Sequence, residues 1–315
     1  MSIPSQIIKQ KAQDAGFDLV GICQATEPEG FEFYKEWLNQ DFHASMKYME
    51  DSIELRKSPQ SILPNAKSII GVLLNYNQPN EPELGMPRIS TYALGRDYHK
   101  VIKGKLKKIA RELKEIYPKE NFRSCVDSVP IFDREYAQKA GLGWFGKNSC
   151  LINTKRGSYF CIGLLLTTLE IEPDQPAIGY CGNCTLCIEA CPTGAIVHHN
   201  DRWQIDARKC ISYWNIEHKG EIDPEIASKM GDWTYGCDIC QDVCPFNQAR
   251  DHQPLRAQKT KEKDYLAKKK WPKLVELAQI SYEDWDQLTQ GSAVRRAGWE
   301  GLKRNSTINI NNLSE

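Results

Sequence analysis

The sequence has no segment that could cross a membrane or direct export. Its longest apolar runs, Ser68 to Leu74 and Tyr159 to Leu169, fall well short of the roughly 20 residues that span a bilayer, and they predict buried strands instead. The N-terminus has no basic region followed by an apolar one and no twin-arginine pair. We therefore expect a cytoplasmic protein with no membrane partner.

The sequence also has no excess of charge of either sign. Its 41 Lys and Arg residues balance 41 Asp and Glu residues, so only a local patch could attract a polyanion. With 41% apolar residues, the chain has the composition of a globular protein with a packed core. Its 315 residues are enough for two domains, or for one domain and an appendage.

Helix and strand patterns alternate in the first part of the chain. Apolar residues recur at helical spacing from Tyr98 to Ile116. Periodicity predicts other helices at 6–15, 37–49 and 134–140, strands at 17–22, 67–74, 122–129, 150–153 and 158–169, and a glycine-rich turn at 141–148. A proline-containing linker at 170–179 leads to a cysteine-rich module ending near residue 250. A basic, helical tail follows it.

Twelve cysteines are more typical of metal ligation than of disulfides in a cytoplasmic protein, because that compartment keeps thiols reduced. Cys181, Cys184, Cys187 and Cys191 have the spacing C-x2-C-x2-C-x3-C and are followed by Pro192. This run is typical of ferredoxins with two 4Fe-4S clusters, in which the fourth cysteine binds the other cluster. The sequence therefore predicts two clusters.

A second motif supplies the remaining ligands. Cys237, Cys240 and Cys244, followed by Pro245, are one cysteine short of the first motif, and Cys210 is the predicted replacement. The two predicted sets are Cys181, Cys184, Cys187 with Cys244, and Cys191 with Cys210, Cys237 and Cys240. A pair of structural zinc sites is the alternative, although zinc sites do not require the longer cysteine run.

The other four cysteines are predicted to be small core residues, because they are scattered among apolar neighbours. They are Cys23, Cys125, Cys150 and Cys161.

Six further segments accompany the two cysteine motifs. They are Leu55-Arg56, Leu63 to Ser68, Gly95 to His99, Val126-Asp127-Ser128, Glu135-Tyr136-Ala137 and Gly141 to Asn148. In these segments and both cysteine motifs, over about residues 1 to 305, the chain resembles the epoxyqueuosine reductase family, which consists of cobalamin-dependent iron–sulfur enzymes that finish queuosine synthesis in the anticodon of tRNA.

This resemblance implies an α+β protein with three parts. A nitroreductase-like, cobalamin-binding α/β domain is expected at 1–170, a ferredoxin-like domain with two 4Fe-4S clusters at 171–250, and a helical basic segment at 251–315. By the same resemblance, the expected cobalamin contacts are Arg56, Ser90, Asp127, Leu151, Asn153, Ile162 and Ser212. The base-off motif D-x-H-x-x-G is absent, since Ile102 replaces its glycine, so His99 is not expected to bind cobalt.

The implied reaction reduces epoxyqueuosine to queuosine at the wobble position, and it releases the epoxide oxygen as water with two electrons and two protons. The clusters would relay electrons singly from an external donor to cobalamin. Asp127 is the position that the family uses as proton donor, which burial could favour by raising the pKa of its carboxyl. On sequence alone, Asp127 could instead cap the turn before Pro130.

Two other functions remain open from the sequence. A reductive dehalogenase of small organohalides has similar cofactors, but usually carries a twin-arginine signal. A plain electron carrier would not need some 170 residues ahead of the cysteine motifs. We expect a monomer that acts on tRNA carrying epoxyqueuosine, because nothing in the sequence indicates a coiled coil.

Overall fold

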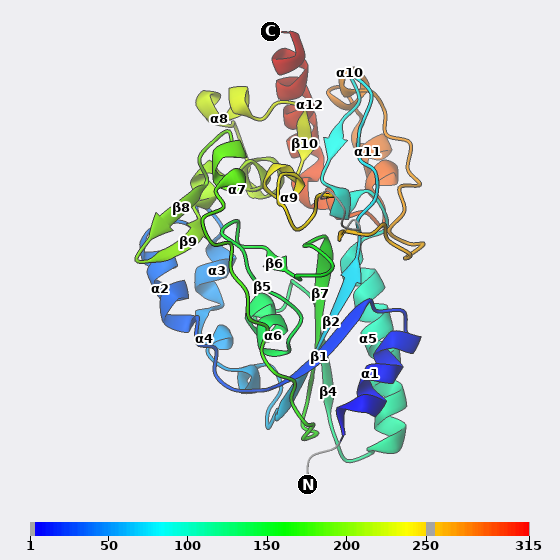
Figure 1. Cartoon of the computed structure of the whole chain (residues 1–315). Helices are drawn as coiled ribbons and strands as arrows, with labels where there is room; N and C mark the ends of the chain where they lie inside the picture. Colours follow the sequence, from blue (N-terminus) through cyan, green and yellow to red (C-terminus); the bar gives the residue numbers. More distant parts are fainter. Residues whose placement is uncertain (1–3, 250–255, 315) are drawn as a thin grey trace.

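The chain folds into a sheet domain, a cysteine module beside it and a helical segment that packs on both (Figure 1). The computed structural model describes residues 4–249 and 256–314. The predicted boundary at 250/251 lies outside these residues. The elements of the first part are α1 (Ser5–Asp14), β1 (Leu19–Gln24), α2 (Phe31–Asn39), α3 (Lys47–Asp51), α4 (Ile53–Arg56), η1 (Pro59–Ser61), β2 (Ser68–Asn75), β3 (Arg88–Ile89), η2 (Thr91–Ala93), α5 (Tyr98–Ile116), β4 (Phe122–Cys125), α6 (Asp133–Lys139), β5 (Trp144–Phe145), β6 (Leu151–Ile152) and β7 (Phe160–Thr167).

The second part contains the cysteine module and the C-terminal segment. Its elements are α7 (Leu186–Ala190), β8 (Ile196–His199), β9 (Arg202–Ile205), η3 (Ala207–Lys209), the π-helix η4 (Tyr213–Glu217), α8 (Pro224–Lys229), β10 (Trp233–Tyr235), α9 (Ile239–Asp242), α10 (Leu274–Leu277), α11 (Tyr282–Thr289), η5 (Ala293–Ala297) and α12 (Gly298–Ser314). No helix in the described part of the chain is both long and apolar enough to span a bilayer.

A four-stranded antiparallel sheet in the order β1-β2-β7-β4 forms the centre of the first part. Side chains of a strand alternate between the two faces of a sheet. In β2, Ile70 and Val72 therefore face the core shared with α1 and α5, whereas Ile69 and Leu73 face the core shared with α6. Helices cover both faces (Figure 1), which explains why the two central strands read as continuous apolar runs.

Helix α5 spans the residues predicted from its periodicity. The Asp97 side chain accepts a hydrogen bond from the His99 backbone amide at 3.0 Å and so caps the start of the helix. Buried Val101, Ile102 and Leu106 face the sheet. The first turn of α5 is thereby fixed beside the upper end of the central strands.

Two sequence predictions were wrong in detail. The helix predicted at 37–49 is divided into α2 and α3, because Asp41 and Ala44 adopt positive φ angles of 55° and 53°, which a right-handed helix does not allow. The strand predicted at 122–129 ends at Cys125, since Asp127 also has a positive φ, 43°. Both interruptions occur where residues adopt left-handed backbone angles.

The three expected parts of the chain are joined by a strand pair and a common hydrophobic core. Strand β3 pairs in parallel with β10 of the cysteine module. A single hydrophobic core contains Ile89 from the first part, Tyr235 from the module, and Leu277 and Leu302 from the C-terminal segment. The C-terminal segment is therefore an integral part of the fold.

Gly21 is the position at which α6 approaches the sheet most closely. A Cβ atom there would lie 1.9 Å from the Ala140 carbonyl oxygen, so Gly21→Ala should force a backbone shift and lower the unfolding temperature by about 5 °C. Gly104→Ala is the control, because a Cβ at this position on α5 meets nothing within 4 Å and improves helix propensity. Equal unfolding temperatures in a calorimetric scan would contradict this packing.

Candidate active site and cluster-binding module

The cysteines of the first motif lie close to Cys240 and Cys244 of the second motif. Burial raises the pKa of the Cys187 thiol to about 12, and the charges of Cys240, Cys181, Cys244 and Cys184 add to the rise. Helix α7, which carries Cys187, contacts α9, which carries Cys240. The structure thus brings the two sequence motifs together.

The remaining predicted ligands lie in the same region. Burial raises the pKa of the Cys210 thiol to about 11, and the charges of Cys240 and Cys191 contribute. Burial also raises the pKa of the Cys237 thiol, with contributions from Cys240 and Cys210. No three His, Cys, Asp or Glu side chains within residues 4–249 and 256–314 converge on a point that one metal ion could occupy.

Several backbone amides point at these sulfur atoms. The Ala195 amide donates to Cys191 Sγ at 3.3 Å and the Lys147 amide to Cys181 Sγ at 3.4 Å. Backbone hydrogen bonds also stabilise the charged form of Cys244. Such donors stabilise negative charge on sulfur and tune the potential of an iron–sulfur cluster.

The glycine-rich turn at 141–148 contacts the cysteine module. Lys147 Nζ donates to the carbonyl oxygens of Gly182 and Cys184, both at 2.9 Å, and Asn148 Nδ2 donates to the Cys240 carbonyl at 3.1 Å. The turn therefore fixes the cysteine loops against the sheet domain.

Cys150 differs from the other cysteines outside the motifs. Cys23, Cys125 and Cys161 are buried core residues as predicted, whereas Cys150 is partly exposed. A hydrogen bond between the Cys150 and Cys240 thiols is the largest cause that raises the pKa of Cys240. Sequence reasoning missed this proximity, because Cys150 has no motif spacing to either run.

Asp127 lies at the first turn of α5. Its carboxylate Oδ2 is 3.1 Å from His99 Nε2, and His99 Nδ1 is 2.8 Å from Asp97 Oδ1. Tyr98 also hydrogen-bonds to Asp127 and stacks on His99 at 4.0 Å between ring centroids. Asp127 does not cap the turn before Pro130 through its side chain, but faces a histidine and a tyrosine that sequence reasoning did not connect with it.

Asp127 and His99 shift each other's pKa. Although burial acts to raise the pKa of the Asp127 carboxyl, the hydrogen bond and charge of His99 lower it below its usual value. Burial likewise acts to lower the pKa of His99, but its hydrogen bonds to Asp127 and Asp97 raise it to about 9. In this arrangement the pKa of Asp127 is lowered and that of His99 is raised, which favours a charged carboxylate beside a protonated imidazole.

Apolar side chains lie at the open end of the core between the sheet and α6. Ile162 and Phe160 on β7, together with Val129, are only partly buried and pack against this core, of which Leu151 is a member. The structure thus brings Leu151 and Ile162 together in one core.

Arg56 and Asn153 each contact another residue of the first part of the chain. The Arg56 guanidinium lies over the Tyr34 ring, 5.2 Å from its centroid, at the end of α4. Asn153 Nδ2 donates to the Leu142 carbonyl at 2.8 Å. Both polar groups are partly buried.

Ser90 of the first part of the chain and Ser212 of the cysteine module both contact the module. The Ser90 hydroxyl is buried and donates to the Asp238 carboxylate, between the cysteines of the second motif. The backbone amide of Ser212 hydrogen-bonds to the Cys210 thiol. Ser90 thus supports the module rather than facing an open space.

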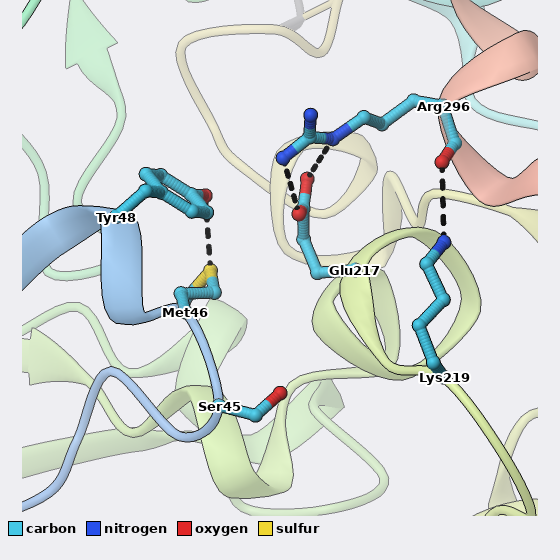
Figure 2. Close-up of a pocket in the computed structure, with 6 residues that line it drawn as sticks. All are labelled: Ser45, Met46, Tyr48, Glu217, Lys219 and Arg296. Atoms are coloured by element: carbon cyan, nitrogen blue, oxygen red, sulfur yellow. Dashed lines mark hydrogen bonds and ion pairs between the residues drawn. The ribbon is translucent and has the colours of Figure 1, made fainter.

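A polar pocket of about 270 Å³ lies where α3, η4 and η5 meet (Figure 2). Tyr48 and Met46 form one side, and Arg296 forms the other. Two hydrogen bonds, of 2.9 and 2.7 Å, join the Arg296 guanidinium to the Glu217 carboxylate. Sequence reasoning missed this pocket, because its residues come from segments some 170 and 80 positions apart.

Two family models match the chain. One, described as "4Fe-4S double cluster binding domain", matches residues 180–247. The other, described as "Epoxyqueuosine reductase QueG, DUF1730", matches residues 56–128. The first supports iron–sulfur clusters over the zinc alternative.

Solved structures of epoxyqueuosine reductase share the fold. The Streptococcus thermophilus structure has a TM-score of 0.82 at 29% identity and covers 99% of this chain and 82% of that one. A structure with an epoxyqueuosine-modified tRNA stem loop has a TM-score of 0.82 at 28% identity, over 98% and 81% of the two chains. In the Bacillus subtilis structure, with the same TM-score, identity and coverage, an aspartate-bearing catalytic loop is swung out of the active site.

Curated relatives match nearly the whole chain. The epoxyqueuosine reductase of Leadbetterella byssophila is 42% identical over 305 residues, which is 96% of both chains. That of Escherichia coli is 39% identical over 318 residues, which is 98% of this chain and 81% of the other. With this identity along almost its entire length, the chain belongs to the epoxyqueuosine reductase family.

Proposed function

We propose that this protein reduces epoxyqueuosine to queuosine in the anticodon of tRNA. The observation that carries the proposal is 42% identity to an epoxyqueuosine reductase across 96% of both chains. A structural relative at 28% identity binds an epoxyqueuosine-modified tRNA stem loop. The substrate is a tRNA, and we further propose a cytoplasmic monomer that takes electrons from an external one-electron donor.

The cysteine module holds the electron relay in this proposal. Cys181, Cys184, Cys187 and Cys244 bind one 4Fe-4S cluster, and Cys191, Cys210, Cys237 and Cys240 bind the other. The charge of Cys240 acts on both Cys187 and Cys210, but those of Cys181, Cys184 and Cys244 act on Cys187, and that of Cys191 acts on Cys210, which supports this division. Burial of uncompensated thiolates is costly, and iron would provide the compensating charge.

The residues near Asp127 fit cobalamin. The partly exposed Phe160, Ile162 and Val129 beside Leu151 offer an apolar surface on which a flat macrocycle could lie. We propose that residues 1–170 form a nitroreductase-like cobalamin domain, that 171–250 form the ferredoxin-like domain, and that 251–315 complete the fold. The proposed contacts are Arg56, Asp127, Leu151, Asn153, Ile162 and Ser212, with Ser90 in a supporting role. When bound, cobalamin would supply the two electrons that reduce the epoxide.

Asp127 and His99 supply one of the two protons that the departing oxygen takes up to leave as water, and solvent supplies the other. At neutral pH the pair holds one proton, on His99, whose pKa is about 9. Transfer of this proton to Asp127 makes the carboxylic acid that the reaction requires, and Asp97 holds the imidazole in place through Nδ1. Tyr98 fixes the other side of the carboxylate.

Conversion of the substrate tests both the function and the acid. We expect anaerobically reconstituted protein with cobalamin and a strong reductant to convert epoxyqueuosine in tRNA to queuosine, as measured by nucleoside mass spectrometry. Asp127→Asn should lower the rate by about 10²- to 10⁴-fold, the usual contribution of a general acid. Asp201→Asn is the matched control, because Asp201 is an exposed aspartate that also has a positive φ.

Two results would contradict these assignments separately. Protein with full iron and cobalamin that converts no epoxyqueuosine would refute the function. Conversion at equal rates by the Asp127→Asn and Asp201→Asn variants would refute only the role of Asp127.

The pH dependence of conversion tests whether His99 holds the proton that is used in the reaction. Single-turnover rates in the wild type should fall as the pH rises through about 9, because His99 then loses its proton. In the His99→Gln variant the fall should begin at lower pH, since Asp127 must then hold the proton alone. The same profile in both proteins would show that the proton reaches the substrate by another route.

Iron content tests the fourth ligand of the second cluster. Cys210→Ala should reduce bound iron from about eight to about four atoms per chain, as measured by iron analysis and by loss of the cluster absorbance. Cys150→Ala is the comparison, because Cys150 is the other thiol next to Cys240, and it should retain full iron. The reverse outcome would assign the ligand to Cys150.

A further inference from the structure

The pocket between Tyr48 and Arg296 has the size of one nucleotide. Its volume, about 270 Å³, lies near the lower end of the range for small-molecule sites, roughly 300 to 1,000 Å³. Residues from the first part, the cysteine module and the C-terminal segment all line it (Figure 2). A site of this size can hold a single unit of a nucleic-acid strand.

The pocket is close to the candidate acid. Tyr98, which hydrogen-bonds to Asp127, packs against Tyr92 at 5.7 Å between ring centroids, and Tyr92 packs against Tyr235 at 6.2 Å. The Tyr235 hydroxyl in turn donates to the Ala293 carbonyl at 2.7 Å, in the same η5 segment that carries Arg296. A strand that presents one base to Asp127 would therefore bring an adjacent nucleotide towards this pocket.

One wall is suited to a base. Tyr48 is a large aromatic side chain with 45% of its surface exposed, and the Arg296 guanidinium lies 5.6 Å from its ring centroid. Single-stranded RNA is recognised by stacking of splayed bases on aromatic rings and guanidinium planes. Tyr48 and Arg296 offer both kinds of surface.

The other wall is suited to a phosphate. The Arg296 side chain is 57% exposed, although it pairs with Glu217. Lys219 Nζ donates to the carbonyl oxygens of Arg296 and Ala297, at 3.4 and 3.0 Å, which leaves its charge uncompensated by a carboxylate there. The pocket is thus lined by two cations, Arg296 and Lys219, and one carboxylate, Glu217. The pocket therefore has a net positive charge.

We infer that this pocket binds a nucleotide adjacent to the modified one in the anticodon loop, with its base on Tyr48 and its phosphate on Arg296 and Lys219. The inference rests on the proposed function and specifies how the RNA is held. Glu217 orients the Arg296 guanidinium and reduces the net charge of the pocket. The C-terminal segment thus contributes directly to substrate binding.

Binding of an unmodified anticodon stem-loop RNA to the cluster-loaded protein tests the inference, with fluorescence anisotropy at several salt concentrations. Arg296→Gln should weaken binding about tenfold and reduce the salt slope by about 1. Tyr48→Leu should weaken binding about tenfold with an unchanged slope, because stacking releases no counterions. Arg295→Gln is the matched control, since its neighbouring guanidinium pairs with Asp286 and lies over Trp285 instead.

Glu217→Gln distinguishes binding from a structural role. Removal of this carboxylate makes the pocket more positive, so RNA should bind at least as tightly as to the wild type. If Arg296 merely held the fold through its ion pair with Glu217, both variants would weaken binding alike. That result, or equal affinity of the Arg296→Gln and Arg295→Gln variants, would overturn the inference.

The turnover assay gives a second readout. Arg296→Gln and Tyr48→Leu should raise KM for the modified tRNA about tenfold and leave kcat within about twofold, because neither side chain acts on the reacting atoms. Iron content and unfolding temperature confirm that each variant is folded. The binding measurements need no turnover, so they judge the pocket whatever the conversion assay shows.

Discussion

The packing of the cysteine loops on the sheet domain is the constraint on which the site depends. Trp144 and Ile152 of the sheet domain form one small core with Cys244 and partly buried Cys181, and Trp144 packs edge-on against Phe246 at 5.4 Å. A Cβ atom on Gly179 would lie 2.3 Å from the Trp144 ring, so the linker must pass directly over this indole. The loops that would enclose the clusters therefore obtain part of their apolar wall from outside their own sequence.

The turn that carries Trp144 also connects the cysteine loops to the proposed cobalamin surface. The same glycine-rich turn that carries Trp144 donates hydrogen bonds to the carbonyls of the cysteine loops, and β6, which follows it, carries Leu151. Electron transfer is fast only when the donor and acceptor groups are held close to each other. A rigid turn that contacts both the cysteine loops and the proposed cobalamin surface keeps these groups close without a flexible linker.

In the proposed mechanism, the ion pair of Asp127 and His99 accounts for how an aspartate with a lowered pKa would act as an acid. The Asp127 side chain is 61% exposed, so burial opposes its ionisation only in part and water stabilises the charged pair. A ligand and substrate that cover the pair remove this water, and two separated charges are costly in a medium of low dielectric constant. In the proposed mechanism, transfer of the proton from His99 to Asp127 would then give a neutral pair, so the acid would form only when the site is filled.

The sequence predicted what depends on local pattern or fixed spacing. The bounds of α5, the buried strands and the convergence of both cysteine motifs follow from periodicity and spacing. The division of α2 from α3 could not be predicted, because it depends on backbone angles at Asp41 and Ala44 that many residues avoid. The contact of Asp127 with His99 joins the segment after β4 to the start of α5 across 28 positions, and no local pattern encodes it.

The balanced charge of the whole chain conceals how its cations are used. Arg295 is neutralised by Asp286, as are many surface cations in a protein with equal numbers of both signs. Lys219 and Arg304 instead donate to backbone carbonyls, those of η5 and of the segment 214–220. Carbonyl oxygens satisfy the donors without cancelling the charge. A neutral protein can thus keep a local positive site for a phosphate strand, because affinity for RNA depends on the cations that reach phosphates and not on the net charge.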